Sequence, residues 1–270
     1  MTGMPMPSAG KIAFTETGSG APLVLLHGWS LSRKVWYAQE PFFARSRRVV
    51  TVDLRGHGDS SPAESWSLEE AASDIAALFH RLELRDAALA GWSLGAQVAI
   101  ASVPLLRDRL ERLVLISPTP KFCASDDFPH GLPPSHPAGL ALKLKRRYPE
   151  ALAGFFHSMF DHRGGNTDEA SAAERVLQGA PLPDRDSLLL ALDTLAGSDL
   201  REAVPLLDIP TLIVHGTLDR ICPPGASEWL ARNIPDCRLE MIAETGHAPF
   251  IEKPDVFNCI IEGFLEEVRR

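Results

Sequence analysis

The chain lacks features that several protein classes require. Its 270 residues contain no apolar run approaching the roughly 18 residues that a membrane span needs. The N-terminus, MTGMPMPSAGK, has no positive region followed by an apolar segment, so it does not resemble a secretory signal. We therefore expect a cytoplasmic protein that does not associate with a membrane.

Cysteine is scarce and positive charge is in deficit. The four cysteines lie far apart with no C-x-x-C pair, which argues against a zinc or redox motif, and we expect free thiols at Cys123, Cys222, Cys237 and Cys259. The formal net charge of -8 argues against nucleic-acid binding, which needs a clustered excess of lysine and arginine. One basic cluster stands out, KLKRR at 143–147, and its simplest interpretation is a solvated helix face.

What is present is the composition of a globular protein, 45% hydrophobic and 23% charged. Short apolar runs closed by turn residues predict strands at 22–28, 47–54, 86–91, 112–118, 209–216 and 237–243. Between two of them, 67–82 begins with a serine followed three residues later by glutamate, which is the capping-box signature of a helix. This alternation predicts an α/β fold, a mostly parallel sheet with helices on both faces.

One segment interrupts the alternation. From 120 to 204 the sequence has helical patches separated by proline and glycine clusters, with no strand-like run. We therefore predict one α/β core formed by 1–119 and 205–270, with a helical lid insertion at 120–204.

The pattern G-x-S-x-G occurs at 91–95, where an apolar run meets a small-residue, helix-like stretch. In a strand-to-helix elbow such a serine is strained and exposed at a helix N-terminus, and its flanking glycines allow the close approach of neighbouring chain. Ser93 is therefore a candidate nucleophile. The alternative interpretation is a serine that only caps a helix.

A serine nucleophile needs a base and a group that orients the base. In this type of fold the acid should follow a late strand and the histidine should come last in the chain. Asp219 and His247 stand in those places. Each alone would be ordinary, Asp219 as a solvated turn residue and His247 as a loop histidine, but the ordered set predicts a Ser-Asp-His triad.

Acyl transfer also needs N–H donors for the oxyanion. We expect one from Leu94, the residue after the nucleophile, and the other from Trp29, in the loop after an early strand. We interpret His27 as a residue that fixes this loop, and Asp53 and His57, in the glycine-rich stretch DLRGHGDS, as parts of a structural turn.

Taken together, these motifs resemble the α/β-hydrolase superfamily over essentially the whole chain. The ordered set is H-G-W, D-x-R-G-x-G-x-S, G-W-S-L-G, L-D after the late strand and G-H-A-P-F. Within the superfamily the chain is similar to the methyl ester esterases that act on pimeloyl-acyl carrier protein in biotin synthesis. The similarity includes LLHGWSLSRKVW, GWSLGAQVA, SPTPKFCASDDFP, DLREAVPLLDIPTL and HAPFIEKP.

This resemblance implies a serine carboxylesterase that releases methanol from the carrier-linked pimeloyl ester and needs no metal or organic cofactor. It also implies that lid residues line the acyl-chain pocket, which would be Tyr148 and Leu152 here, beside Trp29, Ser93, Leu94 and His247. Lid arginines of the family bind the acidic carrier. Here the basic residues are Lys143, Lys145, Arg146 and Arg147, whereas Glu150 and Gly154 fall where the family pattern has basic residues.

Other functions remain open at this point. A general short-chain carboxylesterase would use the same triad, because the lid sets the substrate. A haloalkane dehalogenase is disfavoured, since its elbow needs a carboxylate in place of Ser93. A ligand-binding receptor on this fold would have no need of all three triad residues. We expect a monomer.

Overall fold

The computed structural model describes residues 11–160 and 182–267, and seven strands within them form one sheet. Their order across the sheet is β1-β3-β2-β4-β5-β6-β7. The strands are β1 Phe14–Thr17, β2 Ala21–Leu26, β3 Arg47–Val52, β4 Ala87–Trp92, β5 Leu110–Ile116, β6 Thr211–Gly216 and β7 Cys237–Ile242. β1 is antiparallel to β3, and every other neighbouring pair is parallel. The predicted α/β class is confirmed.

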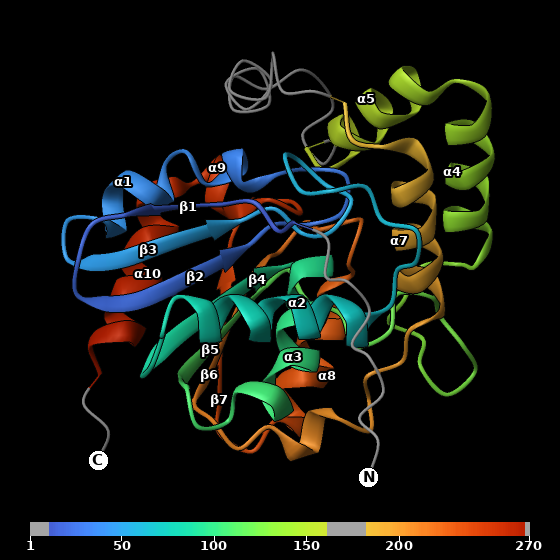
Figure 1. The fold of residues 1–270 in the computed structure, drawn as a ribbon. Helices are drawn as coiled ribbons and strands as arrows, with labels where there is room; N and C mark the ends of the chain where they lie inside the picture. The colour runs from blue at the N-terminus through green and yellow to red at the C-terminus, as the bar shows by residue number, and fades with distance from the viewer. Residues whose placement is uncertain (1–10, 161–181, 268–270) are drawn as a thin grey trace, which may run out of the picture.

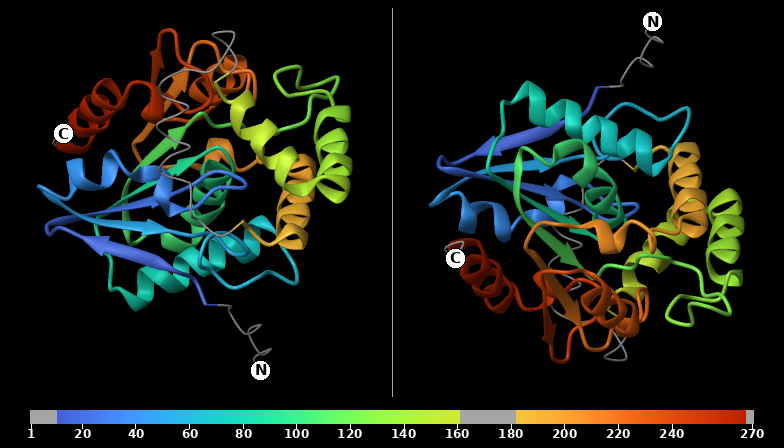
Figure 2. Two further views of the ribbon diagram at one scale, coloured as in Figure 1. Left: turned by 90° about the horizontal axis from the view of Figure 1, so that it is seen from above. Right: turned by 90° about the horizontal axis from the view of Figure 1, so that it is seen from below.

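Helices cover both faces of the sheet (Figures 1 and 2). α1 (Gln39–Phe43) and α10 (Pro254–Glu266) pack together on one face, while α2 (Leu68–Arg81) and α3 (Leu94–Leu106) pack together on the other. α8 (Pro224–Asn233) packs against β6 and β7. Because both faces are covered, all residues of β4 and β6 are buried, as is typical of parallel sheets.

The elements follow the sequence closely. The predicted helix at 67–82 is α2, and its cap forms as expected, because the Ser67 hydroxyl accepts the Glu70 N–H at 3.2 Å. β1 was not predicted; it is a four-residue edge strand whose pattern is too short to stand out. The described residues also contain the short helical elements η1 Arg33–Trp36, η3 Val204–Leu206 and α9 Pro249–Glu252. No helix of the described residues has the length and apolar character of a membrane span.

Between β5 and β6 the chain forms the helices α4 (Ser135–Arg146), α5 (Tyr148–Ser158) and α7 (Arg185–Gly197), which lie at one end of the sheet in Figure 1. Residues 161–181 of the predicted insertion lie outside the described residues. An isolated antiparallel bridge joins Lys121 to Asp199, and an ion pair of 3.1 Å joins the same two side chains. The two ends of this segment therefore meet, as an inserted lid requires. The boundaries 120 and 204 stay a prediction.

The strand order determines where a site can form. β2 pairs with β3 on one side and with β4 on the other, so the direction of winding reverses between β2 and β4. In open α/β sheets the ligand crevice lies beyond the carboxyl ends of the strands at such a reversal. Two of the predicted site segments, the loop after β2 and the G-x-S-x-G elbow after β4, begin at this point.

Candidate active site

Ser93 connects β4 directly to α3 in a strained backbone conformation. Its φ is 55° and its ψ is -114°, a combination that costs a residue with a side chain roughly 1–3 kcal/mol. The flanking glycines make the turn possible, because a Cβ on Gly95 would lie 2.6 Å from the Leu26 carbonyl oxygen and one on Gly91 would collide with the Gly95 backbone. The elbow therefore needs glycine at both positions, as the motif predicted.

The two predicted oxyanion donors flank this elbow. Leu94 is the first residue of α3, and the first N–H groups of a helix have no acceptor within the helix. A Cβ on Gly28 would lie 3.3 Å from the Ser93 Cβ, so the loop that carries Trp29 runs against the elbow. The Trp29 ring is fixed by a hydrogen bond from its Nε1 to the Leu188 carbonyl oxygen, 3.0 Å away.

The predicted acid and base are in direct contact. His247 Nδ1 lies 2.8 Å from Asp219 Oδ2, and both side chains are buried. Because a carboxylate only accepts hydrogen bonds, Nδ1 carries the proton and Nε2 of His247 remains an acceptor. Burial favours a raised pKa for Asp219, but the His247 charge and hydrogen bonds from His215 and His247 outweigh burial and hold this pKa well below its usual range.

Backbone groups fix the other carboxylate oxygen. Asp219 Oδ1 accepts the N–H groups of Ile221 at 2.8 Å and Cys222 at 2.9 Å. Burial raises the pKa of the Cys222 thiol well above its usual value, and the neighbouring Ser93 side chain opposes this shift only in part. The turn that holds Asp219 therefore also contacts the elbow.

A second histidine at this carboxylate was not predicted. His215, in β6, places Nε2 3.2 Å from Asp219 Oδ2 and 2.9 Å from the Cys222 carbonyl oxygen. A histidine near the end of a buried strand looks like any other core residue in the sequence. Only the folded turn at 219–222 brings the acceptors to its ring.

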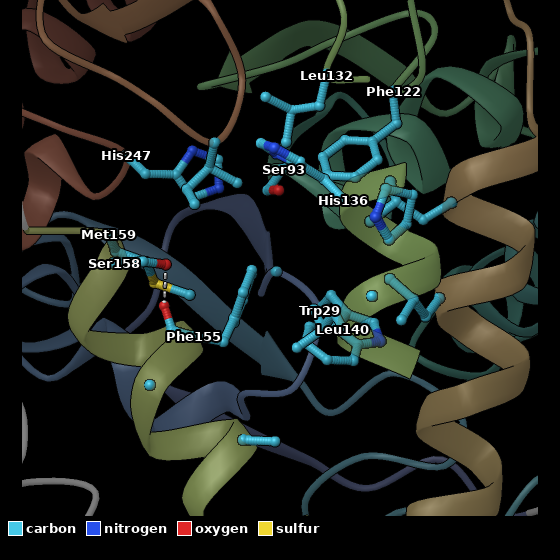
Figure 3. A pocket seen from close by; sticks show the side chains of 18 of the residues that line it. Trp29, Ser93, Phe122, Leu132, His136, Leu140, Phe155, Ser158, Met159 and His247 are labelled. Carbon is cyan, nitrogen blue, oxygen red and sulfur yellow. Dashed lines mark hydrogen bonds between the residues drawn. The ribbon is translucent and has the colours of Figure 1, made fainter. Parts of the chain in front are cut away.

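A pocket of about 570 Å³ opens onto Ser93 and His247 (Figure 3). Much of its wall is apolar and comes from the lid segment, including Phe122, Leu132, Leu140, Ala151, Phe155, Met159, Leu192 and Leu195. Ser93 and His247, both among the described residues, line this pocket, and the structure shows no hydrogen bond between Ser93 Oγ and the His247 ring. Catalytic hydrogen bonds of this kind tighten in the reacting complex.

Two predicted pocket residues point elsewhere. Tyr148 and Leu152 are not among the residues that line the pocket; the Tyr148 hydroxyl instead donates to the Pro183 carbonyl oxygen. The residues of α5 that line the pocket include Ala151, Phe155 and Ser158 instead. The prediction identified a helix that lines the pocket, but not the residues of that helix that do so.

The basic cluster lies next to the pocket. Lys143 lines the pocket and also a second hollow of about 460 Å³, together with Arg146 and Arg147. Glu150 lines both hollows as well. Lys145 is exposed but does not line the second hollow.

The residues interpreted as structural fix loops. His27 is buried between the Gly28 carbonyl oxygen, which accepts from Nδ1 at 2.7 Å, and the Leu54 N–H, which donates to Nε2 at 3.0 Å. Burial lowers the pKa of His27 to about 4 and that of His57 to about 3. Asp53 accepts hydrogen bonds from the backbone and guanidinium of Arg33, and none of the three lines the pocket.

The remaining features are possible metal ligands and the cysteine thiols. Within the part of the chain that the structure describes, no group of three or more histidine, cysteine, aspartate or glutamate side chains is arranged to hold a metal ion. The four cysteines are free, as predicted.

Known proteins match both the sequence and the fold. Residues 23–258 match the model of the alpha/beta hydrolase family. The chain belongs to the alpha/beta hydrolase family. It is 35% identical to a pimeloyl-[acyl-carrier protein] methyl ester esterase of Nitrosomonas europaea, covering 92% of this chain and 96% of that protein. A second esterase with the same name, from Aeromonas hydrophila, is 33% identical and covers 94% and 99%.

Solved structures agree. An esterase from Exiguobacterium antarcticum superposes with a TM-score of 0.88 at 26% identity, covering 96% of each chain. The predicted family and the enzyme class, a carboxylic ester hydrolase, are confirmed.

Proposed function

We propose that this alpha/beta hydrolase is a serine esterase that hydrolyses the methyl ester of pimeloyl-acyl carrier protein, releasing methanol. The observation that carries the proposal is the buried Asp219–His247 pair, 2.8 Å apart, whose histidine lines one mostly apolar pocket together with Ser93. The names of relatives that are 33–35% identical over more than nine-tenths of the chain support the choice of substrate.

In the proposed mechanism Ser93 Oγ attacks the ester carbonyl while His247 Nε2 takes its proton. Asp219 holds the imidazole with the proton on Nδ1 and stabilises the imidazolium that forms. His247 then returns the proton to the methoxide leaving group, and methanol departs from an acyl-serine. A water activated by the same Nε2 releases the acid and frees Ser93. Every step is proton transfer and acyl transfer, and no cofactor takes part.

The negative charge of each tetrahedral intermediate falls on the former carbonyl oxygen. We assign its stabilisation to the backbone N–H groups of Trp29 and Leu94. Two features support this assignment: Leu94 is at the positive end of the α3 dipole, and the Trp29 loop runs against the elbow.

The pocket suits an acyl chain. Its volume of about 570 Å³ is within the ordinary range for small-molecule sites, and its wall is mostly hydrocarbon from α4, α5 and α7. A pimeloyl chain is a run of methylene groups, each of which gains roughly 0.8 kcal/mol on leaving water. Apolar lining therefore favours this part of the substrate.

The carrier protein would dock at the basic hollow beside the pocket. A protein of net charge -8 repels an acidic carrier in general, so docking needs a local positive patch. Lys143, Arg146 and Arg147 supply one, and Lys143 also reaches the main pocket. Lys145, on the same helix, adds to the positive field from outside the hollow. Monomeric state and cytoplasmic location stay predictions.

A general short-chain carboxylesterase is the second candidate. The likeness to the Exiguobacterium antarcticum esterase favours it, as does Glu150, a negative charge in the hollow where the carrier would dock. The two candidates share the triad and differ only in what the lid recognises.

A comparison of free and carrier-linked substrates separates them. We would measure kcat/KM for methyl pimelate as a free ester and on acyl carrier protein, at low and raised salt. The proposal predicts a large preference for the carrier form that shrinks with salt. The triple variant Lys143→Ala/Arg146→Ala/Arg147→Ala should lose that preference, whereas Lys145→Ala, the matched control on the same helix, should lose much less. Equal rates for both substrates would favour the general esterase.

A further inference from the structure

The second histidine at the catalytic carboxylate has no part in the proton transfers described above. His215 is fully buried in β6, four residues before Asp219. Its ring is held at both nitrogens: Nδ1 lies 2.6 Å from the Ser227 hydroxyl of α8, and Nε2 lies 2.9 Å from the Cys222 carbonyl oxygen and 3.2 Å from Asp219 Oδ2.

The partners fix the tautomer of His215. Both neighbours of Nε2, a carbonyl oxygen and a carboxylate oxygen, only accept hydrogen bonds, so Nε2 carries a proton. The Ser227 hydroxyl can donate to Nδ1 or accept from it, and its Oγ also lies 3.5 Å from the Pro118 carbonyl oxygen. His215 is therefore an N–H donor aimed at the turn that holds Asp219.

Three N–H groups donate hydrogen bonds to the Asp219 carboxylate, and the Nε2–H of His215, which donates to the Cys222 carbonyl oxygen, lies close enough to Oδ2 to act as a fourth. Oδ1 receives the two backbone groups of Ile221 and Cys222, and Oδ2 is shared by the two histidines. The Cys222 backbone connects His215 to the carboxylate, because its N–H donates to Asp219 and its carbonyl oxygen accepts from His215. The carboxylate can rotate only by breaking one of these contacts.

We propose that His215 is a positioning residue for catalysis, which orients Asp219 Oδ2 toward His247 and shares the negative charge of that oxygen through its Nε2–H. This inference rests on the proposed roles of Asp219 and His247. Because two donors compete for Oδ2, His215 weakens the hold of the carboxylate on the His247 imidazolium. Its loss should make His247 harder to deprotonate.

The acidic limb of the pH profile reports this effect, since His247 must be neutral to accept the serine proton. Titratable and charged groups around the pair come from each packed segment. They are His215 from β6, Arg220 and the Cys222 thiol from the turn after β6, Glu252, which accepts the Gly246 N–H, and His136, Lys143 and Glu150 across the pocket. Of these groups, His215 alone contacts the carboxylate oxygen that His247 also contacts, so a substitution there changes the Asp219–His247 contact most directly.

Three variants of the full chain test the proposal. His215→Leu removes the donor, and His215→Gln keeps an N–H at a similar reach. Ser227→Ala, the matched control, removes the Nδ1 partner and leaves the Nε2 donor in place. Each would be compared with wild type for kcat, KM and the pH dependence of kcat/KM on a soluble free ester, with the thermal unfolding midpoint as a check of folding.

We expect His215→Leu to lower kcat on the order of 10- to 100-fold with little change in KM, the size of loss that a small misplacement of a reacting group causes. Its acidic limb should move to higher pH, whereas His215→Gln and Ser227→Ala should keep the limb close to wild type. If His215 had only a structural role, His215→Leu would reduce the fraction of active molecules but leave the acidic limb of the pH profile at the same pH.

An unmoved limb in folded His215→Leu, or equal losses in His215→Leu and His215→Gln, would overturn the proposal. If His215→Leu does not fold, His215→Gln decides the question. A kcat and an acidic limb of the pH profile close to those of wild type would support the donor role. A large loss of kcat in a folded His215→Gln variant would contradict it. Ser93→Ala, measured in the same assays, distinguishes a failure of the proposed triad from a failure of the proposed role of His215. Full turnover in Ser93→Ala would refute the proposed triad itself, whereas its inactivity beside a wild-type-like His215→Leu would refute only the role of His215.

Discussion

Replacing Asp219 by asparagine should reverse the tautomer of His247. The carboxylate faces four N–H donors, two of them backbone groups on Oδ1 that cannot become acceptors. The single amide oxygen of an asparagine would therefore occupy the Oδ1 position, and its NH₂ group would face His247 Nδ1. His247 would then accept at Nδ1 and carry its proton on Nε2, where it cannot take the proton of Ser93.

The magnitude follows from the lost base. A triad with the wrong histidine tautomer loses about 10⁴ in kcat, or about 5.5 kcal/mol of transition-state stabilisation. The NH₂ group would also meet the Nε2–H of His215, which leaves buried donors without acceptors and should lower the free energy of unfolding by about 1–3 kcal/mol.

The assay is kcat/KM of Asp219→Asn on a free methyl ester at pH 7, with urea unfolding to measure stability. Asp208→Asn is the control, since Asp208 is an exposed aspartate that pairs with Arg107 and does not line the pocket. A folded Asp219→Asn variant within tenfold of wild type would refute the assignment of Asp219 as the residue that orients His247.

Further predictions concern the pocket and acid stability. Gly154 lies on α5 and lines the pocket, and a Cβ at this position would meet no atom within 4 Å. Gly154→Phe should therefore fold and narrow the pocket. It should lower kcat/KM for pimeloyl esters more than for acetyl esters. Gly197→Phe, equally open but outside the pocket, should leave that ratio unchanged. Gly154→Ala should keep activity and stabilise α5 by up to about 1 kcal/mol, measured by urea unfolding. His27 and His57 have pKa values of about 4 and about 3 in the fold against an ordinary 6.5, so the unfolded chain binds more protons between pH 6.5 and 4. The free energy of unfolding should therefore fall with decreasing pH by about 1.4 kcal/mol per unit for each histidine, and a flat profile between pH 6.5 and 5 in urea unfolding would contradict this.

Local chemistry made much of the site predictable from the sequence. Glycines on both sides of Ser93 are required by backbone contacts of the elbow itself, so the motif carries its own geometry. Asp219 and His247 follow strands in a fold whose connections place strand ends together, so their chain order predicts their meeting.

Tertiary packing decided what could not be predicted. α5 has apolar side chains on more than one face, so its sequence does not reveal which of them line the pocket. The docking of α5 over the elbow turns Ala151 and Phe155 into the pocket instead. His215 was missed for a similar reason, because its partners come from a turn and a helix that follow it in the chain.

The most direct test of the central claim is to trap the acyl-enzyme. Rapid quenching during turnover of methyl pimelate, followed by mass spectrometry of the digested chain, should find a single pimeloyl group on the peptide that contains Ser93 and none on Ser93→Ala, which should also lose nearly all turnover. Undiminished hydrolysis by Ser93→Ala, or an acyl group on a different residue, would contradict the proposal that Ser93 is the nucleophile.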